Sequence, residues 1–162
     1  MNPYDTAMQI EKEGEALYAD FAKRSPSKGL AIIFMRLAED ELRHYEVFEK
    51  MKKNRQPVIV KSALPDDAET VFSELKKETF DFSLSQPDLY RKALEAEKKS
   101  IQFYTQYAKA ARSEEERDVF LSIIREERQH AAIVENIIEF LTAPETWSEN
   151  AEFIRSGEEY IL

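Results

Sequence analysis

Apolar residues recur every three or four positions in four long segments of the chain, which is the spacing of one buried face of an α-helix. Prolines and capping residues bound these segments, because proline suits the first turn of a helix and disrupts its interior. The pattern predicts four helices, which cover residues 3–23, 27–54, 87–111 and 114–142.

The predicted helix starts carry capping signals. Asn2-Pro3 indicates a cap followed by the first helical residue, and Ser25-Pro26 repeats this signal before the second helix. Ser113 begins a Ser-x-x-Glu sequence with the spacing of a capping box before the fourth helix.

Short connections join the first helix to the second and the third to the fourth, so each pair is expected to form an antiparallel hairpin. A crossover of about residues 55–86 separates the pairs and is predicted to contain a short helix over residues 66–80. We expect an all-α four-helix bundle that forms one domain over residues 1–143. The tail, residues 144–162, is too apolar for a solvated segment, and we expect a short helical tail docked on the bundle or on a partner subunit.

Composition narrows the class of protein. Only three of the 162 residues are glycine, which favours long helices joined by few loops. No cysteine is present, which excludes disulfides, thiolate zinc sites, iron–sulfur clusters and cysteine catalysis. The net charge of −9 disfavours binding to nucleic acid or to an anionic membrane surface. Without a signal peptide or a membrane-spanning apolar run, the sequence predicts a cytoplasmic protein.

The two predicted hairpins align without a gap at an offset of 86 residues. Identity between them is low, and it is concentrated in a few aromatic, acidic and histidine positions. The matched pairs include Tyr4 and Tyr90, Glu11 and Glu97, Tyr18 and Tyr104, Phe34 and Phe120, Glu41 and Glu127, and His44 and His130.

One glutamate interrupts the apolar face of each predicted long helix near its middle. Each of the chain's two histidines follows such a glutamate by three residues and therefore lies on the same face. The six residues are Glu11, Glu41, His44, Glu97, Glu127 and His130. Burying a carboxylate costs several kcal/mol even after relaxation, and no lysine or arginine falls on these faces to compensate. Two divalent cations would balance four carboxylates, and two neutral imidazoles would complete the ligand set.

Each of these features has a simpler interpretation when it is taken alone. A single glutamate on an apolar face is usually a boundary residue, and an isolated Glu-x-x-His motif is common by chance. A metal site is favoured because both histidines occupy this motif and share the offset that relates Glu11 to Glu97. Tyr18 and Tyr104 are either core residues or, as we prefer, donors of hydrogen bonds to ligand carboxylates.

The constellation resembles the ferritin-like di-iron carboxylate superfamily, and most closely its rubrerythrin branch. These bundles take one glutamate from each of two helices and a Glu-x-x-His pair from each of the other two. The resemblance covers roughly residues 3–142 and implies a ferritin-like four-helix bundle that holds two iron ions. Manganese accepts the same ligands.

The resemblance also implies a role for each ligand. The glutamates of the two Glu-x-x-His motifs, Glu41 and Glu127, would bridge the metals, and the histidines of these motifs would each bind one ion. Glu11 and Glu97 would be terminal ligands, one for each half of the site.

Rubrerythrin-like proteins use a diferrous centre to reduce hydrogen peroxide to water, and relatives use dioxygen or oxidise ferrous ions. The resemblance therefore implies an oxidoreductase that acts on hydrogen peroxide or dioxygen, and we expect a homodimer. Full-length rubrerythrins carry a four-cysteine rubredoxin domain that supplies electrons, so a chain without cysteine is expected to need a separate electron-donor protein. They also carry a further carboxylate one turn from the ligand on the third helix, and the residues at this spacing from Glu97 are not acidic.

Two other functions are compatible with the same motifs. A ferritin-like ferroxidase or iron-handling protein would form a large hollow assembly and hold many iron ions per chain. A non-catalytic helical binding module would be stabilised by the metal and would show no redox turnover.

Overall fold

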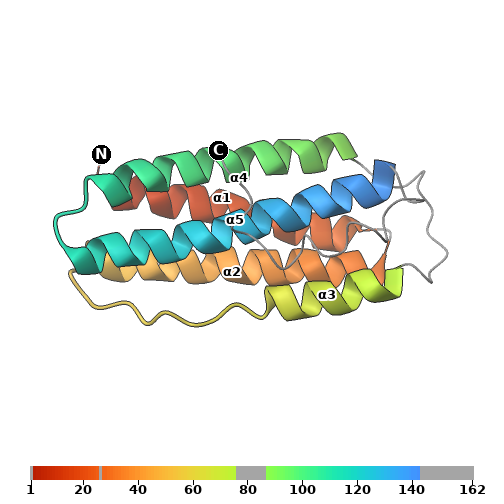
Figure 1. Ribbon diagram of the computed structural model, residues 1–162, viewed down its shortest axis with the longest axis horizontal. Helices are drawn as coiled ribbons and strands as arrows, with labels where there is room; N and C mark the ends of the chain where they lie inside the picture. The colour runs from red at the N-terminus through yellow and green to blue at the C-terminus, as the bar shows by residue number, and fades with distance from the viewer. Residues whose placement is uncertain (1, 26, 76–86, 143–162) are drawn as a thin grey trace. The chain divides into compact units, whose positions relative to one another are not determined.

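The computed structural model describes residues 2–25, 27–75 and 87–142, which form five α-helices and no strand (Figure 1). The four long helices begin and end within two residues of their predicted bounds, which confirms the all-α prediction. The helices are α1 (Pro3–Arg24), α2 (Lys28–Lys52), α3 (Leu64–Leu75), α4 (Pro87–Lys109) and α5 (Glu114–Thr142). None of the helices in these ranges is long and apolar enough to cross a membrane.

The cap of α1 is the predicted one, and the cap of α2 is not. The side chain of Asn2 accepts a hydrogen bond from the backbone N–H of Tyr4 at 2.9 Å. The prediction that Ser25 caps α2 is wrong, because Ser25 is the C-cap of α1 and has an extended backbone. Ser27 caps α2 instead, and its hydroxyl accepts from the N–H of Leu30 at 3.3 Å.

The start of α5 contains the predicted Ser-x-x-Glu cap. The Ser113 hydroxyl accepts from the N–H of Glu116 at 3.0 Å, and the Glu116 carboxylate accepts from the N–H of Arg112 at 2.6 Å. Ser27 and Ser113 are separated by the 86-residue offset of the repeat. The second helix of each hairpin therefore begins with the same capping contact.

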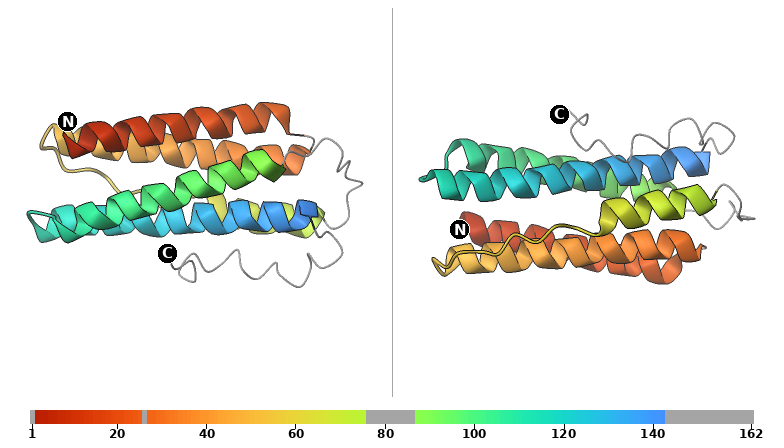
Figure 2. Two further views of the ribbon diagram at one scale, coloured as in Figure 1. Left: turned by 90° about the horizontal axis from the view of Figure 1, so that it is seen from above. Right: turned by 60° about the horizontal axis from the view of Figure 1, so that its bottom comes forward.

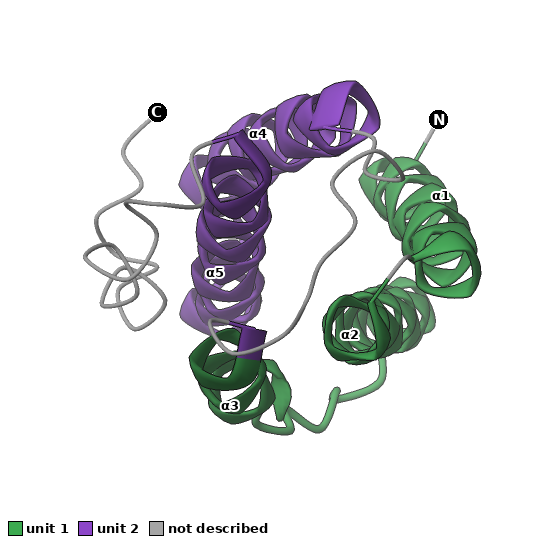
Figure 3. Cartoon of the chain, turned by 90° about the vertical axis from the view of Figure 1, so that its right-hand side faces the viewer, with its two compact units in different colours: residues 1–74 green, residues 75–162 purple. Residues whose placement is uncertain are grey.

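The chain divides into two compact units, residues 1–74 and 75–162 (Figure 3). In the first unit α1 packs on α2, and in the second unit α4 packs on α5. Both expected helical hairpins are therefore present, each within its own unit.

An extended segment after α2 runs back along this helix to α3, which lies beside α2 (Figure 2). Arg36 of α2 and Asp67 of α3 form an ion pair with Nε and Oδ2 2.6 Å apart. The predicted short helix begins two residues early, at Leu64. Its predicted end, at Phe80, and the predicted helical tail, residues 144–162, lie outside the described residues.

Equivalent residues of the repeat are buried in both units. Phe34 and Phe120 are at most 2% exposed, as are Tyr18 and Tyr104. The rings of Tyr18 and Phe34 have centroids 6.4 Å apart, and those of Tyr104 and Phe120 are 6.3 Å apart. The matched sequence positions therefore reproduce the same aromatic contact.

Candidate metal centre

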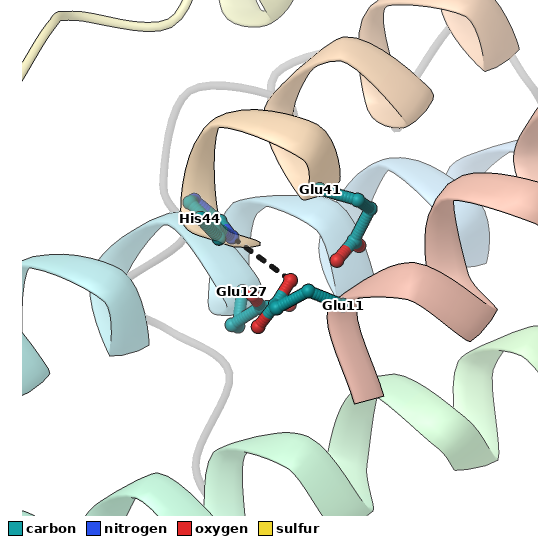
Figure 4. Close-up of side chains that lie close together, drawn as sticks. All are labelled: Glu11, Glu41, His44 and Glu127. Carbon is teal, nitrogen blue, oxygen red and sulfur yellow. Dashed lines mark ion pairs between the residues drawn. The ribbon is translucent and has the colours of Figure 1, made fainter. Parts of the chain in front are cut away.

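The first unit buries two carboxylates and an imidazole close together. Glu11 comes from α1, and Glu41 and His44 come from consecutive turns of α2; we call these residues the first triad. Their exposed fractions are 0%, 4% and 0%. His44 Nδ1 lies 3.4 Å from Glu11 Oε2, as the dashed line in Figure 4 marks. Each residue offers one ligand atom within 4.8 Å of those of the other two.

The second unit contains the equivalent set. Glu97 comes from α4, and Glu127 and His130 come from α5; these residues form the second triad. Their exposed fractions are 4%, 1% and 0%. His130 Nδ1 lies 3.5 Å from Glu127 Oε2 and 3.7 Å from Glu97 Oε1. The three ligand atoms again lie within 4.8 Å of one another.

Long, regular helices position both triads. α2 has 25 residues and α5 has 29, and the Glu-x-x-His pair lies in the interior of each. Residues three positions apart share one face of a helix, so the glutamate and histidine of each pair point the same way. Side chains on helices are also held more precisely than side chains on loops.

The distances within the triads fit ligands that share a cation. A hydrogen bond between nitrogen and oxygen is usually about 2.7–3.2 Å long, whereas the N···O distances here are 3.4–3.7 Å. Two donors that bind one ion at about 2.1 Å are about 3.0 Å apart at octahedral angles and about 3.4 Å apart at tetrahedral angles. Carboxylate-rich sets with one imidazole suit iron or manganese. The residues therefore fit a metal ion both in donor type and in spacing.

Glu97 shows the electrostatic cost of the second triad. Burial, together with the nearby Glu127 carboxylate, raises the pKa of the Glu97 carboxyl to about 8, while His130 acts in the opposite direction. Without a cation the Glu97 carboxyl is therefore protonated near neutral pH. A bound divalent ion would supply the positive charge that keeps it ionised.

Comparison with known proteins identifies the family. The rubrerythrin family model matches residues 5–138, and a second match covers residues 88–154. The chain belongs to the rubrerythrin family. The predicted resemblance is thereby confirmed, and with it the ferritin-like helical class of fold. Searches among curated proteins and among solved structures found no match.

Membership of the rubrerythrin family supports oxidoreductase chemistry in general and an iron site held by carboxylates and histidines. In each buried triad, the carboxylate oxygens and the histidine nitrogen lie close enough together to hold a metal ion. The assignment of individual residues as ligands remains our prediction.

The two tyrosines that were predicted to lie near the ligands are both buried against aromatic side chains. Tyr18 is 2% exposed and stacks on Phe34, and its ring meets that of Phe21 edge to face. Tyr104 is fully buried and packs against Phe103 and Phe120. Their expected hydrogen bonds to ligand carboxylates remain a prediction.

Sequence reasoning missed a buried polar cluster beside the first triad. Asp40, the residue before Glu41, is 5% exposed and accepts hydrogen bonds from Ser62 Oγ at 2.5 Å and from Arg43 at 2.9 Å. The Ser62 hydroxyl also accepts from the N–H of Leu64 at 3.1 Å. Asp40 thus holds the start of α3 on α2. The available signal was a serine four residues before the predicted helix start at residue 66, which is two residues before the observed start at Leu64.

Proposed function

We propose that this protein is a di-iron oxidoreductase that reduces hydrogen peroxide or dioxygen, with two iron ions held between the first and second triads. The observation that carries the proposal is the pair of buried Glu, Glu and His sets at one sequence offset in a rubrerythrin-family chain. Either set alone would be weak evidence, because buried acidic residues occur for other reasons. Their repetition with the same residue types and the same burial favours a common ligand role.

The charges of the six residues match two divalent cations. Four ionised glutamates carry −4 and two ferrous ions carry +4, while neutral imidazoles add no charge. The raised pKa of Glu97 supports this balance, because it shows that the carboxyl is unfavourable as an anion when only the protein surrounds it. The metal would therefore stabilise the ionised form of the triads.

We infer that the two hairpins pack as one four-helix bundle, a single domain over residues 1–143, with the triads facing each other. A pair of helices has no interior of its own, so carboxylates that are at most 4% exposed need a further layer of protein over them. The family's ferritin-like fold supports the second hairpin as this layer.

Within the bundle each ligand has a proposed role. Glu41 and Glu127 would bridge the ions, while the histidines of the same helices would each bind one. Glu11 and Glu97 would complete one half-site each. The hydroxyls of the two buried tyrosines would donate hydrogen bonds to ligand carboxylates and so fix their orientation.

The surroundings of the ligands exclude bulk water. Phe34 and Phe120 lie about two helical turns before the glutamates of the Glu-x-x-His pairs, on the same face of the helix, and are at most 2% exposed. When bound, a pair of ferrous ions supplies the two electrons that split an O–O bond. Reduction of one hydrogen peroxide to two water molecules also consumes two protons. Because the chain has no cysteine, we propose that a separate protein returns the electrons. We also propose that the protein acts as a homodimer.

The test is anaerobic reconstitution with ferrous iron, followed by rapid mixing with hydrogen peroxide. We expect two iron ions per chain and oxidation faster than that of free ferrous ion at the same concentration. Oxidation no faster than the free ion would contradict the proposal. Many iron ions per chain in a large assembly would favour iron handling instead, and a higher melting temperature without oxidation would favour a binding module. Elemental analysis of protein purified without added metal would distinguish iron from manganese.

A further inference from the structure

Gly14 lies in the interior of α1, three residues after Glu11 and on the same face of the helix. Glycine is less favourable than alanine inside a helix because its backbone loses more conformational entropy on folding. No glycine among the described residues has a positive φ, so the backbone conformation does not require glycine at this position. The space around Gly14 supplies a different reason.

A side chain at position 14 would press closely against Glu41 of the first triad. A Cβ atom placed on Gly14 would lie 3.0 Å from the Glu41 carboxyl carbon, 3.1 Å from Oε2 and 3.3 Å from Cγ. These three nearest atoms all belong to one side chain. At such distances the neighbour must move by a few tenths of an ångström.

A shift of this size matters for a metal ligand. Metal–ligand distances are fixed to within about 0.2 Å in well-formed sites. Glu41 is 4% exposed, so its side chain is enclosed by packed neighbours. We propose that Gly14 is a positioning residue for metal binding. Its missing side chain lets the Glu41 carboxylate rest against the backbone of α1, in the position from which it binds the ion. This inference rests on the proposed function, since it takes Glu41 as a ligand.

The repeat provides a matched comparison within the same chain. The residue equivalent to Gly14 in the second unit is Ser100, which is 8% exposed. Its hydroxyl donates a hydrogen bond to the backbone carbonyl of Ala96 at 3.0 Å, within its own helix. The second unit therefore accommodates a side chain at this position. In the first unit, by contrast, the absence of a side chain at position 14 leaves space for Glu41.

The experiment compares the wild type with Gly14→Ala and Ser100→Ala. Metal-free proteins are melted, and ferrous iron is then titrated anaerobically by equilibrium dialysis. We expect metal-free Gly14→Ala to melt close to the wild-type temperature, because the better helix propensity of alanine offsets the shift that its Cβ forces on Glu41. We expect its affinity for at least one of the two ions to fall about tenfold or more. Ser100→Ala should bind both ions as the wild type does.

The same substitution in a protein that carries Glu41→Asp distinguishes an effect of the contact with Glu41 from a general loss of structure. In Glu41→Asp the carboxylate is withdrawn from α1, so adding Gly14→Ala should no longer lower the affinity. An equal loss of affinity in both backgrounds would overturn the proposal, as would a folding defect in Gly14→Ala that Glu41→Asp does not relieve.

The same titration distinguishes the two proposals from each other. A wild type that binds two ions, together with Gly14→Ala that binds them equally well, would overturn only the role of Gly14. A wild type that binds no ion would overturn the proposed function and this inference with it.

Discussion

The hairpin of α1 and α2 and the hairpin of α4 and α5 share their ligands and differ in what surrounds them. Both bury two glutamates and a histidine, and both place a tyrosine against a phenylalanine nearby. The first hairpin has Gly14 where the second has Ser100, and Asp40 where the second has Glu126. The two hairpins therefore share the proposed ligands, the aromatic packing and the serine caps, and differ at positions next to the ligands.

In both hairpins the histidine lies close to glutamate carboxylates. In the first hairpin His44 faces the glutamate of the other helix, Glu11, at 3.4 Å. In the second hairpin His130 lies between Glu127 of its own helix at 3.5 Å and Glu97 of the other at 3.7 Å. Equal ligand types in unequal settings are expected to bind their two ions with unequal affinity. Equivalent substitutions in the two hairpins can therefore be compared for their effects on metal content, metal affinity and stability.

Removal of a proposed bridging ligand should have the largest effect and should be alike in both hairpins. We expect Glu41→Ala and Glu127→Ala to reduce bound iron from two ions to one or none, and to lower the rate of oxidation by peroxide more than about 100-fold. Metal content is measured by elemental analysis after anaerobic loading. The control is Glu15→Ala, a half-buried residue one turn after Glu11, which should keep both ions. Two ions in both ligand variants would contradict the assignment.

The raised pKa of Glu97 predicts a pH dependence for the metal-free second hairpin. The folded state holds the Glu97 proton up to about pH 8, whereas the unfolded chain releases it near pH 4.5. The unfolding free energy should therefore fall as pH rises through this window, by at most about 1.4 kcal/mol per unit. Glu97→Gln cannot ionise, so its stability relative to the wild type should increase with pH.

Urea denaturation of the metal-free proteins between pH 5 and about pH 8.5 measures this difference. Glu95→Gln, an exposed change on the same helix, should retain the pH dependence of the wild type. Parallel curves for Glu97→Gln and the wild type would refute the prediction.

The tyrosines should contribute to metal affinity in both hairpins. Tyr18→Phe and Tyr104→Phe keep the rings and their aromatic contacts and remove only the hydroxyls. If the hydroxyls orient ligand carboxylates, ferrous affinity should fall about 10- to 100-fold in each variant. Anaerobic titration measures it. Wild-type affinity in both variants would show that these are plain core tyrosines.

Asp40 should matter for stability only in the first hairpin. Asp40→Ala leaves the Ser62 hydroxyl and Arg43 without their acceptor and should lower the unfolding free energy by about 2 kcal/mol. For a chain of this size, the melting temperature should drop by about 4–8 °C. Glu126→Ala at the equivalent, half-buried position should cost less. Equal losses would mean that the Asp40 cluster has no special role.

The equivalent serine caps should give the smallest effect. Ser27→Ala and Ser113→Ala each remove one hydrogen bond to a helix N–H and should cost about 1 kcal/mol. The loss should be greater for Ser27, which is 6% exposed, than for the exposed Ser113. Thermal melts of the metal-free variants measure both. A larger cost at Ser113 would contradict this ranking.

Local signals account for what the sequence predicted correctly. Prolines and caps act on adjacent residues, and so the long helices were placed to within two residues. The six residues of the triads were selected because helical spacing puts Glu41 and His44 on one face and because the second hairpin repeats that pattern. Their burial and proximity agree with this selection, and their role as ligands is still a prediction.

The features that were missed depend on spatial proximity. Ser62 and Asp40 are 22 residues apart and meet only because the chain runs back along α2. Gly14 follows Glu11 at helical spacing in the sequence, but its closeness to the Glu41 carboxylate depends on how the two helices pack. The cap of α2 was assigned to Ser25 because the proline signal does not reveal that α1 extends to Arg24.

Burial of the proposed donors has a consequence for how fast metal would enter and leave. Glu11, His44 and His130 expose none of their surface, so an ion in bulk solvent meets none of these three directly. If these residues are ligands, loading would wait for a local opening of the helices, a process that takes microseconds to seconds in proteins. Uptake would then saturate at high iron concentration, at the rate of that opening. Release would have the same limit, so a strong chelator would remove the metal no faster than the helices open.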